Sequence, residues 1–284
     1  MRVLVTGSAG MLAQALLPAL ERSGHEVLGV DVADADITRP DALRHAVRSF
    51  PPDWIFHLAA FTRVDDCEAQ PDLAFRVNGL GARNVALAAA GCGAAILAIS
   101  TDYVFDGSAT SPYREYDRVN PQSVYGASKW AGEQGVREIH PQHIIVRTAW
   151  LYGRGGTNFV DTILKKAGAG EPLRVVDDQR GSPTWTEDLA PALIQLAERG
   201  QHGTFHVTNS GDCTWREFAA HIVAKAGLAV SVLPITTAAL GRAAPRPAYS
   251  TLCNQFFEDV IGTRLPSWQE AVDRYLESRL GRGR

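Results

Sequence analysis

The stretch VTGSAGMLA, residues 5–13, lies between a short β-branched run and the start of a helical pattern. Its small residues Gly7, Gly10 and Ala13 recur at every third position. In a strand–turn–helix unit the first permits a tight turn, the second lets the backbone approach a pyrophosphate, and the third packs the helix on the strand. The stretch predicts a dinucleotide site at a helix N-terminus, with Met11 and Leu12 among its contacts. The alternative is a glycine turn without a ligand.

The alternation that begins here continues through the first half of the chain. Apolar, β-branched runs are expected to form strands at 2–7, 26–31, 54–60, 94–100 and 143–150. Helical Ala/Leu patterns separate them at 11–23, 41–50, 73–90 and around Tyr125. Uninterrupted apolar strands that alternate with helices are typical of a parallel sheet covered on both faces. We therefore predict an α/β, doubly wound, Rossmann-like fold with an NAD(P)-binding domain over residues 1–150.

The pattern changes after Trp150. A glycine-rich loop, a helix at 161–168, and a strand with a turn-rich loop over 173–185 precede a helix at 186–199. The remainder, including TFHVTNSG at 204–211, is typical of a smaller, irregular α+β region. We expect residues 151–284 to form mainly a substrate-binding region, with the helix at 186–199 packing back onto the first domain.

The composition is that of an ordinary soluble globular protein. The 284 residues are 45% hydrophobic and 21% charged, with a formal net charge of −3, which argues against nucleic-acid binding. The cysteines are scattered, without the spacing of a disulfide framework or a zinc site. No signal peptide or membrane-spanning stretch is predicted. We expect a cytoplasmic protein whose partners include neither nucleic acid nor membrane.

Asp31 closes the second predicted strand, where a carboxylate can accept hydrogen bonds from the adenosine ribose. Such a carboxylate repels a 2′-phosphate and favours NADH over NADPH, unless a nearby Arg2 or Arg63 offsets it. The alternative is a residue that only ends the strand. Further cofactor contacts are expected near the adenine and after the third strand, from Asp36, Ile37, Ala59, Ala60 and Thr62.

SVYGASKWAGE, residues 123–133, places Tyr125 and Lys129 four positions apart, on one face of a predicted helix. A neighbouring cation favours the phenolate, so the tyrosine can donate and accept a proton. Ser100 and Thr101 end a buried strand at the sheet edge where such folds bind ligands. The spacing to Tyr125 favours Thr101 over Ser100. The alternative for the Tyr–Lys pair alone is a partly buried tyrosine beside a solvated lysine.

The glycine motif and the Thr–Tyr–Lys set together resemble the extended short-chain dehydrogenases/reductases. Later motifs extend the resemblance over nearly the whole chain to one branch, the dTDP-4-dehydrorhamnose reductases. These motifs are STDYVFDG (100–107), VYGASKWAGE (124–133), VRTAWLYG (146–153), NFV (158–160), VVDDQRGSPTWTEDLA (175–190) and RPAYSTL (246–252). That family reduces the C4 ketone of a dTDP-bound 6-deoxy-4-keto sugar.

The resemblance implies that Thr101, Tyr125 and Lys129 are catalytic. Tyr125 protonates the C4 oxygen as a hydride arrives from NADPH or NADH, and Thr101 hydrogen-bonds the same oxygen. Lys129 holds the nicotinamide ribose and lowers the pKa of the phenol. The implied substrate is dTDP-4-dehydro-L-rhamnose and the product dTDP-L-rhamnose. Two alternatives stay open: a 4-ketoreductase for another NDP-deoxysugar, and a non-catalytic nucleotide-binding regulatory subunit, which has no need of the intact set.

The resemblance also implies substrate contacts from Asp102, Tyr103, Trp150, Asn158 and Arg246. Trp150 offers an aromatic plane, Asn158 an amide for sugar hydroxyls, and Arg246 a guanidinium for the diphosphate. Related 4,6-dehydratases carry a glutamate at the position of Tyr103, so simple reduction is preferred over dehydration. The alternatives are a core role for Trp150 and surface solvation for Arg246.

Some members of that family bind Mg²⁺ at a dimer interface through glutamates, one of them in the first helix. At the matching place this chain has Ala15, with Gln14 beside it, and only Glu187 remains of the set. We therefore assign no metal site, and a need for Mg²⁺ is doubtful. A monomer and a homodimer both stay open.

Overall fold

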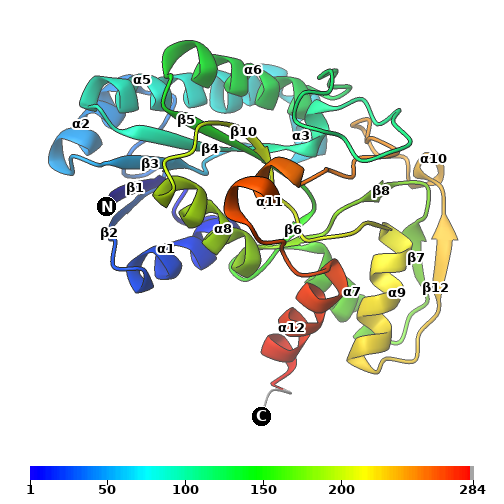
Figure 1. The fold of residues 1–284 in the computed structure, drawn as a ribbon. Coiled ribbons are helices and arrows are strands. Elements are labelled where there is room, and N and C mark those ends of the chain that lie inside the picture. Colours follow the sequence, from blue (N-terminus) through cyan, green and yellow to red (C-terminus); the bar gives the residue numbers. More distant parts are fainter. Residues whose placement is uncertain (282–284) are drawn as a thin grey trace.

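A six-stranded parallel sheet organises the computed structural model, which describes residues 1–281 (Figure 1). Its strand order is β10-β5-β4-β3-β1-β2, and each neighbouring pair is parallel. The strands are β1 (Arg2–Thr6), β2 (Glu26–Val30), β3 (Trp54–His57), β4 (Ala95–Thr101), β5 (His143–Thr148) and β10 (Gly203–His206). The predicted doubly wound α/β fold is confirmed.

Helices cover both faces of this sheet, as Figure 1 shows. One face packs against α1 (Met11–Arg22) and α8 (Thr186–Glu198), with α11 (Gln255–Ile261) beside β10. The other packs against α2 (Pro40–Ser49), α5 (Ala82–Cys92) and α6 (Val124–Ile139). Alternate side chains of β1, β3 and β4 enter the two layers, so each strand is apolar throughout.

The pattern at 73–90, expected to be one helix, is divided. After α3 (Val64–Ala69) and α4 (Pro71–Ala74), the chain forms a π-helical segment, η1 (Phe75–Gly81), and then α5. Asn78 lies buried in η1, where its amide binds the backbone of Phe61. π-helical turns commonly occur at functional sites, and periodicity alone does not reveal them.

The sixth strand corrects the sequence-based assignment of residues 204–211 to the smaller region. β10 pairs in parallel with β5 instead. A parallel neighbour needs a crossover connection, and α8 supplies it by burying Leu189 and Leu193 in the layer that also contains α1. A four-residue edge strand carries too short a pattern to reveal its partner.

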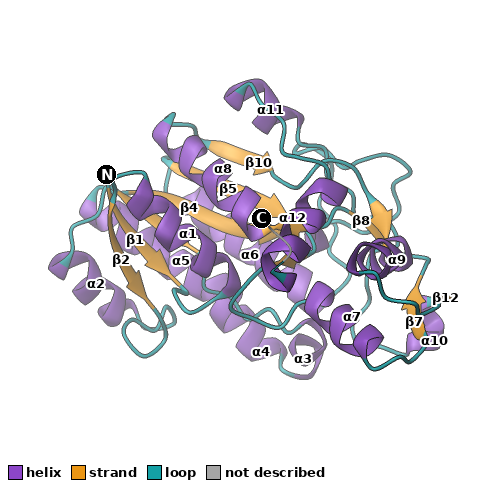
Figure 2. Ribbon diagram, turned by 90° about the horizontal axis from the view of Figure 1, so that it is seen from below, coloured by secondary structure: helices purple, strands orange, loops and turns teal. Residues whose placement is uncertain are grey.

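The smaller region lies beyond the ends of β4 and β5 (Figure 2). It contains three two-stranded pairs: β6 (Leu151–Tyr152) with β9 (Thr184–Trp185), β7 (Leu173–Val176) with β12 (Val232–Ile235), and β8 (Arg180–Gly181) with β11 (Cys213–Thr214). Its helices are α7 (Phe159–Gly168), α9 (Trp215–Ala226), α10 (Thr237–Leu240) and α12 (Trp268–Leu280). None of the helices within residues 1–281 combines the length and apolar content that a membrane span requires.

Tyr152, in the core of this region, has a buried hydroxyl without a hydrogen-bond partner, while its ring packs against Phe218 and Tyr275. An unsatisfied buried polar group costs about 1–3 kcal/mol. We expect Tyr152→Phe to raise the free energy of unfolding by about 1 kcal/mol, measured by urea denaturation. A loss of stability of that size would show that the hydroxyl has a partner in solution.

Candidate active site

A cavity of about 750 Å³ lies at the carboxyl ends of the sheet strands. Gly7 follows β1, Asp31 follows β2, Ala59 lies shortly after β3, and Thr101 ends β4. The residues predicted to bind the cofactor line it: Gly7, Gly10, Met11, Leu12, Asp31, Asp36, Ile37, Ala59, Ala60 and Thr62, together with Tyr125 and Lys129. Ligands bind at this edge in open α/β sheets because the loops leave a crevice there.

The glycine turn shapes one end of the cavity. Gly7 has φ +74°, and a Cβ there would lie 2.7 Å from the backbone nitrogen of Ala59, so only glycine fits. Gly10 precedes α1, whose first backbone N–H groups have no helical partner. The Asp31 carboxylate accepts hydrogen bonds from the backbone N–H groups of Ala9 (2.9 Å) and Val32 (2.8 Å). This end offers N–H donors beside a fixed carboxylate.

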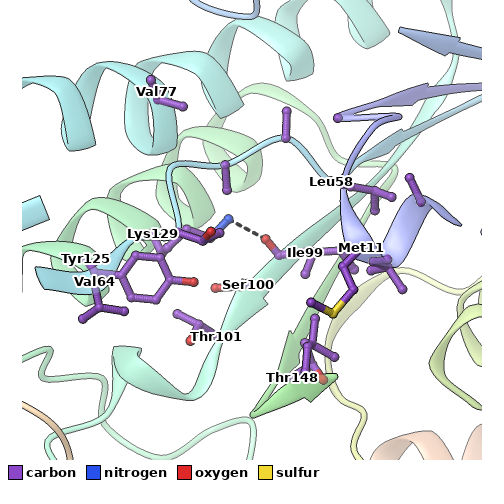
Figure 3. Close-up of a pocket in the computed structure, with 18 of the residues that line it drawn as sticks. Met11, Leu58, Val64, Val77, Ile99, Ser100, Thr101, Tyr125, Lys129 and Thr148 are labelled. Carbon is purple, nitrogen blue, oxygen red and sulfur yellow. Dashed lines mark hydrogen bonds between the residues drawn. The ribbon is translucent and has the colours of Figure 1, made fainter. Parts of the chain in front are cut away.

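Tyr125 and Lys129 face the same space as Thr101 (Figure 3). α6 lies very close to the short 3₁₀ helix η2 (Asp102–Val104). A Cβ at Gly126 would lie only 2.2 Å from the carbonyl oxygen of Tyr103. The small residue between the catalytic candidates therefore lets the tyrosine come beside the strand end. This close approach explains why a glycine follows Tyr125 in VYGASKWAGE.

Tyr125 is a protonated phenol in this environment. Burial raises its pKa above the ordinary value, and a hydrogen bond with Thr101 opposes that shift only in part. Any lowering of this pKa by Lys129 is therefore outweighed by burial in this structure. The ammonium instead donates a 2.7 Å hydrogen bond to the carbonyl oxygen of Ile99 (Figure 3). Protonated tyrosine is the form that a ketone reduction requires.

Lys129 is itself perturbed. Burial lowers its pKa to about 8, although the negative charge of Glu133, one helical turn further on, acts to raise it. His57 ends β3 and is buried. Its Nδ1 lies 2.8 Å from the hydroxyl oxygen of Thr6, and burial lowers its pKa to about 3. That histidine is neutral, as expected for a core residue.

Ser100 and Thr101 have different partners. The Ser100 hydroxyl donates to Glu133 in a buried cluster with Arg147. The Thr101 hydroxyl donates to Asp102 at 3.0 Å and accepts from the backbone of Tyr103 at 3.2 Å. Because adjacent strand residues point to opposite faces, only Thr101 lies with its hydroxyl beside the phenol.

Among the predicted substrate contacts, Asp102, Tyr103 and Trp150 line the cavity. Asp102 is buried, with one carboxylate oxygen lacking a hydrogen-bond partner, and burial raises its pKa to about 6. The Tyr103 ring meets that of Tyr125 edge to face, with centroids 5.4 Å apart. These groups form the wall next to the phenol.

Asn158, predicted to bind substrate, is engaged by the fold in this structure. Its side chain caps α7 by accepting from the N–H of Asp161 (2.9 Å), and its amide donates to the carbonyl oxygen of Gly153 (2.9 Å). Both ends of the amide are therefore occupied by the fold, and the residue does not line the cavity. An asparagine before a helix satisfies free N–H groups there.

Arg246 is also placed differently from the prediction. Its guanidinium makes two hydrogen bonds to the Asp65 carboxylate, at 3.0 and 2.9 Å, and a third to the carbonyl oxygen of Ala244. It does not line the cavity, and its contact with a diphosphate stays a prediction. The acidic partner lies 181 positions away in the chain, and no local pattern announces it.

Sequence reasoning missed Trp215, which lines the cavity and stacks on Trp150. It also missed the buried Thr148, whose hydroxyl has no hydrogen-bond partner. Trp150 is the one non-glycine residue of the described chain with positive φ, +48°. Such backbone strain costs about 1–3 kcal/mol and clusters at ligand sites. Among residues 1–281, no group of three or more His, Cys, Asp or Glu side chains is arranged to hold a metal ion.

The chain is similar to known proteins over almost its whole length. The family model described as RmlD substrate binding domain matches residues 1–280. The spore coat polysaccharide biosynthesis protein SpsK of Bacillus subtilis is 44% identical over 98% of each chain. A dTDP-4-dehydrorhamnose reductase of Streptomyces griseus is 42% identical over 99% of this chain and 95% of its own. The crystal structure of a dTDP-4-dehydrorhamnose reductase from Bacillus anthracis in complex with NADP is 41% identical, with a TM-score of 0.95 over 98% and 99% of the two chains.

Proposed function

Since the chain belongs to the family described as RmlD substrate binding domain, we propose that it reduces the C4 ketone of dTDP-4-dehydro-L-rhamnose to give dTDP-L-rhamnose. One observation carries the proposal: Thr101, Tyr125 and Lys129 line the same cavity as the glycine turn. The candidate proton donor and the candidate cofactor site therefore share one cavity. Non-catalytic nucleotide binding does not require this set.

The residues present fit a nicotinamide dinucleotide. The Gly7 turn leaves room where a Cβ would collide, and the free N–H groups of α1 suit a pyrophosphate. In this proposal Asp31 would bind the adenosine ribose, and Lys129 the nicotinamide ribose. When bound, the dinucleotide supplies the hydride.

The chain's own residues manage the proton. Tyr125 donates its phenolic proton to the C4 oxygen. The Thr101 hydroxyl, which donates to Asp102 in this structure, would turn to donate to the same oxygen and stabilise the charge that develops there. Lys129 holds the ribose through the donors it does not use on Ile99. Asp102, Tyr103 and Trp150 form the walls that position the sugar.

The assay that tests the proposal follows the loss of NADH or NADPH absorbance with dTDP-4-dehydro-L-rhamnose generated in situ, and identifies the product sugar. Formation of dTDP-L-rhamnose supports it. Turnover only with another NDP-keto sugar would assign the chain to that 4-ketoreductase reaction. Cofactor binding without turnover of any keto sugar would favour the regulatory alternative.

We further propose that NADH is preferred, because Asp31 lines the cavity, where its carboxylate would repel a 2′-phosphate, and Lys129 is the only basic side chain among the described residues that line it. Asp31→Asn removes the repulsion, and we expect it to raise the NADPH-to-NADH ratio of kcat/KM about tenfold. Asp72→Asn, on an exposed position of α4, is the control for net charge. A wild-type enzyme that prefers NADPH would contradict this assignment.

Cofactor affinity should depend on the Lys129 charge. Its pKa is about 8, so the ammonium that holds the ribose is present below that pH and is lost above it. We expect the Kd of NADH to rise about tenfold per pH unit above pH 8, measured by cofactor fluorescence. In Lys129→Met the affinity should be weaker at pH 7 and nearly independent of pH. A wild-type Kd that stays constant up to pH 9.5 would argue against the role.

A further inference from the structure

Two tryptophans from different parts of the chain form a stacked pair in the cavity wall. Trp150 follows β5 of the large sheet, and Trp215 begins α9 of the smaller region. Their ring centroids lie 3.5 Å apart, with 5° between the planes. Both line the cavity that contains Thr101 and Tyr125, and both are only partly buried. The stack therefore lies at the edge of the core of the smaller region, where it also lines the site.

The indole of Trp150 is confined on its other side. A Cβ at Gly181 would lie 2.6 Å from Cε2 of that ring, so the glycine leaves the space that the indole occupies. Gly181 has no positive φ, and its backbone conformation therefore does not require glycine. Trp150 does have positive φ, and its carbonyl oxygen accepts from the N–H of Thr184. These contacts hold the Trp150 ring in one orientation, although the backbone of that residue is strained.

Trp215 is in turn held in place. Its Nε1 donates to the side-chain oxygen of Gln179 at 3.2 Å, and the ring of Phe159 packs against it with centroids 4.5 Å apart. The preceding Thr214 forms a capping box with Glu217, which fixes the first turn of α9. The smaller region thus presents a rigid aromatic surface to Trp150.

We propose that Trp215 is a positioning residue for sugar reduction: it fixes the Trp150 indole in the orientation against which the pyranose ring of the nucleotide sugar packs. The inference rests on the proposed function and adds to it the residues that orient the sugar. Trp215 covers one face of that indole and Gly181 confines the other, so the sugar meets the part of the ring that lines the cavity, and the place of that part depends on the stack. The glycine turn that serves the cofactor lies elsewhere in the cavity.

The sharpest variant is Gly181→Ala, because its added methyl group would lie 2.6 Å from Cε2 of Trp150 and so displace that ring, while the glycine turn at the cofactor end of the cavity is unchanged. We expect the KM for dTDP-4-dehydro-L-rhamnose to rise about tenfold, while the Kd of NADH stays at the wild-type value. Gly168→Ala is the matched control. It lies in α7 of the same region, has ordinary φ, and its Cβ would meet nothing within 4 Å.

The second route removes the stack from the other side. Trp215→Leu should raise KM by a similar factor and abolish the exciton signal of the stacked indoles in circular dichroism, while Trp215→Phe should retain most of the substrate affinity. Trp54→Phe removes an indole that packs on Phe56 in the sheet and controls for the loss of one tryptophan. Thermal unfolding of each variant identifies any that does not fold.

The outcomes separate the two proposals. If the wild type does not reduce the dTDP-keto sugar, the proposed function fails and this inference fails with it. If the wild type does so but KM is unchanged in folded Gly181→Ala and Trp215→Leu, only the inference is overturned. An exciton signal that persists in Trp215→Leu would also overturn it, since the pair would not be stacked in solution. A matching rise in KM for both variants, with unchanged Kd for NADH, supports it.

Discussion

Tyr125→Phe will lower kcat by about 10²–10⁴-fold, the usual contribution of a positioned proton donor. The ring and its edge-to-face contact with Tyr103 remain, and only the hydroxyl beside Thr101 is lost. Because burial raises the pKa of this phenol, the group is a stable proton donor at neutral pH, and no other side chain lining the described cavity is a phenol except Tyr103. Kinetics with saturating NADH and dTDP-4-dehydro-L-rhamnose measure the effect.

Tyr152→Phe is the matched control, since it removes a buried tyrosine hydroxyl outside the cavity lining. It should leave kcat unchanged. The Kd of NADH should also stay near the wild-type value in Tyr125→Phe, because the proton donor does not hold the dinucleotide's phosphates. Wild-type turnover in Tyr125→Phe would remove the phenol from the mechanism and leave Asp102, with its unpartnered carboxylate oxygen, as the acid to test next.

Local patterns predicted the parts of the site that depend on local geometry. The glycine turn is fixed by the three-residue spacing from Gly7 to Ala13, and one helical turn places Tyr125 and Lys129 on one face. The carboxyl ends of the strands in a parallel sheet lie at one edge. Topology alone therefore predicted that Thr101, at the end of β4, lies at the same edge as the glycine turn after β1. Each inference needs only the period of one element and the general rule for its fold.

Long-range partners could not be predicted in the same way. Arg246 pairs with Asp65 across the fold, and Asn158 is occupied as a helix cap. Both carry side chains suited to a ligand, and only tertiary structure decides whether the protein itself occupies them. Trp215 shows the reverse case, because a tryptophan at the start of a helix gives no signal that it will reach the cavity.

Glu133→Gln will destabilise the protein by about 3–5 kcal/mol, the cost of removing one partner from a buried ion pair. Glu133 accepts from Arg147 at 3.0 and 2.9 Å and from Arg137 at 2.7 Å. Arg147 is only 1% exposed, so its charge would remain buried without compensation. Urea denaturation measures the loss, and Glu138→Gln, exposed on the same helix, is the control.

The pH dependence of stability gives the same carboxylate a second signature. Burial alone would raise the pKa of Glu133, but the neighbouring Arg147 and Arg137 lower it below the ordinary 4.5. A depressed folded-state pKa contributes stability above pH 4.5 that is lost as the pH falls through the folded value. Wild-type stability should therefore decrease in acid more steeply than that of Glu133→Gln. Parallel acid profiles would mean that the ion pair contributes little.

Glu133 also connects this buried cluster to the chemistry, because it lies one helical turn from Lys129 and its charge raises the pKa of that ammonium. In Glu133→Gln the pKa of Lys129 should fall further below its ordinary value. The loss of NADH affinity with rising pH should then begin at a lower pH than in the wild type. A purely structural carboxylate would reduce stability but leave that midpoint where it is. The folded fraction of the variant, titrated with NADH across pH, separates these two roles.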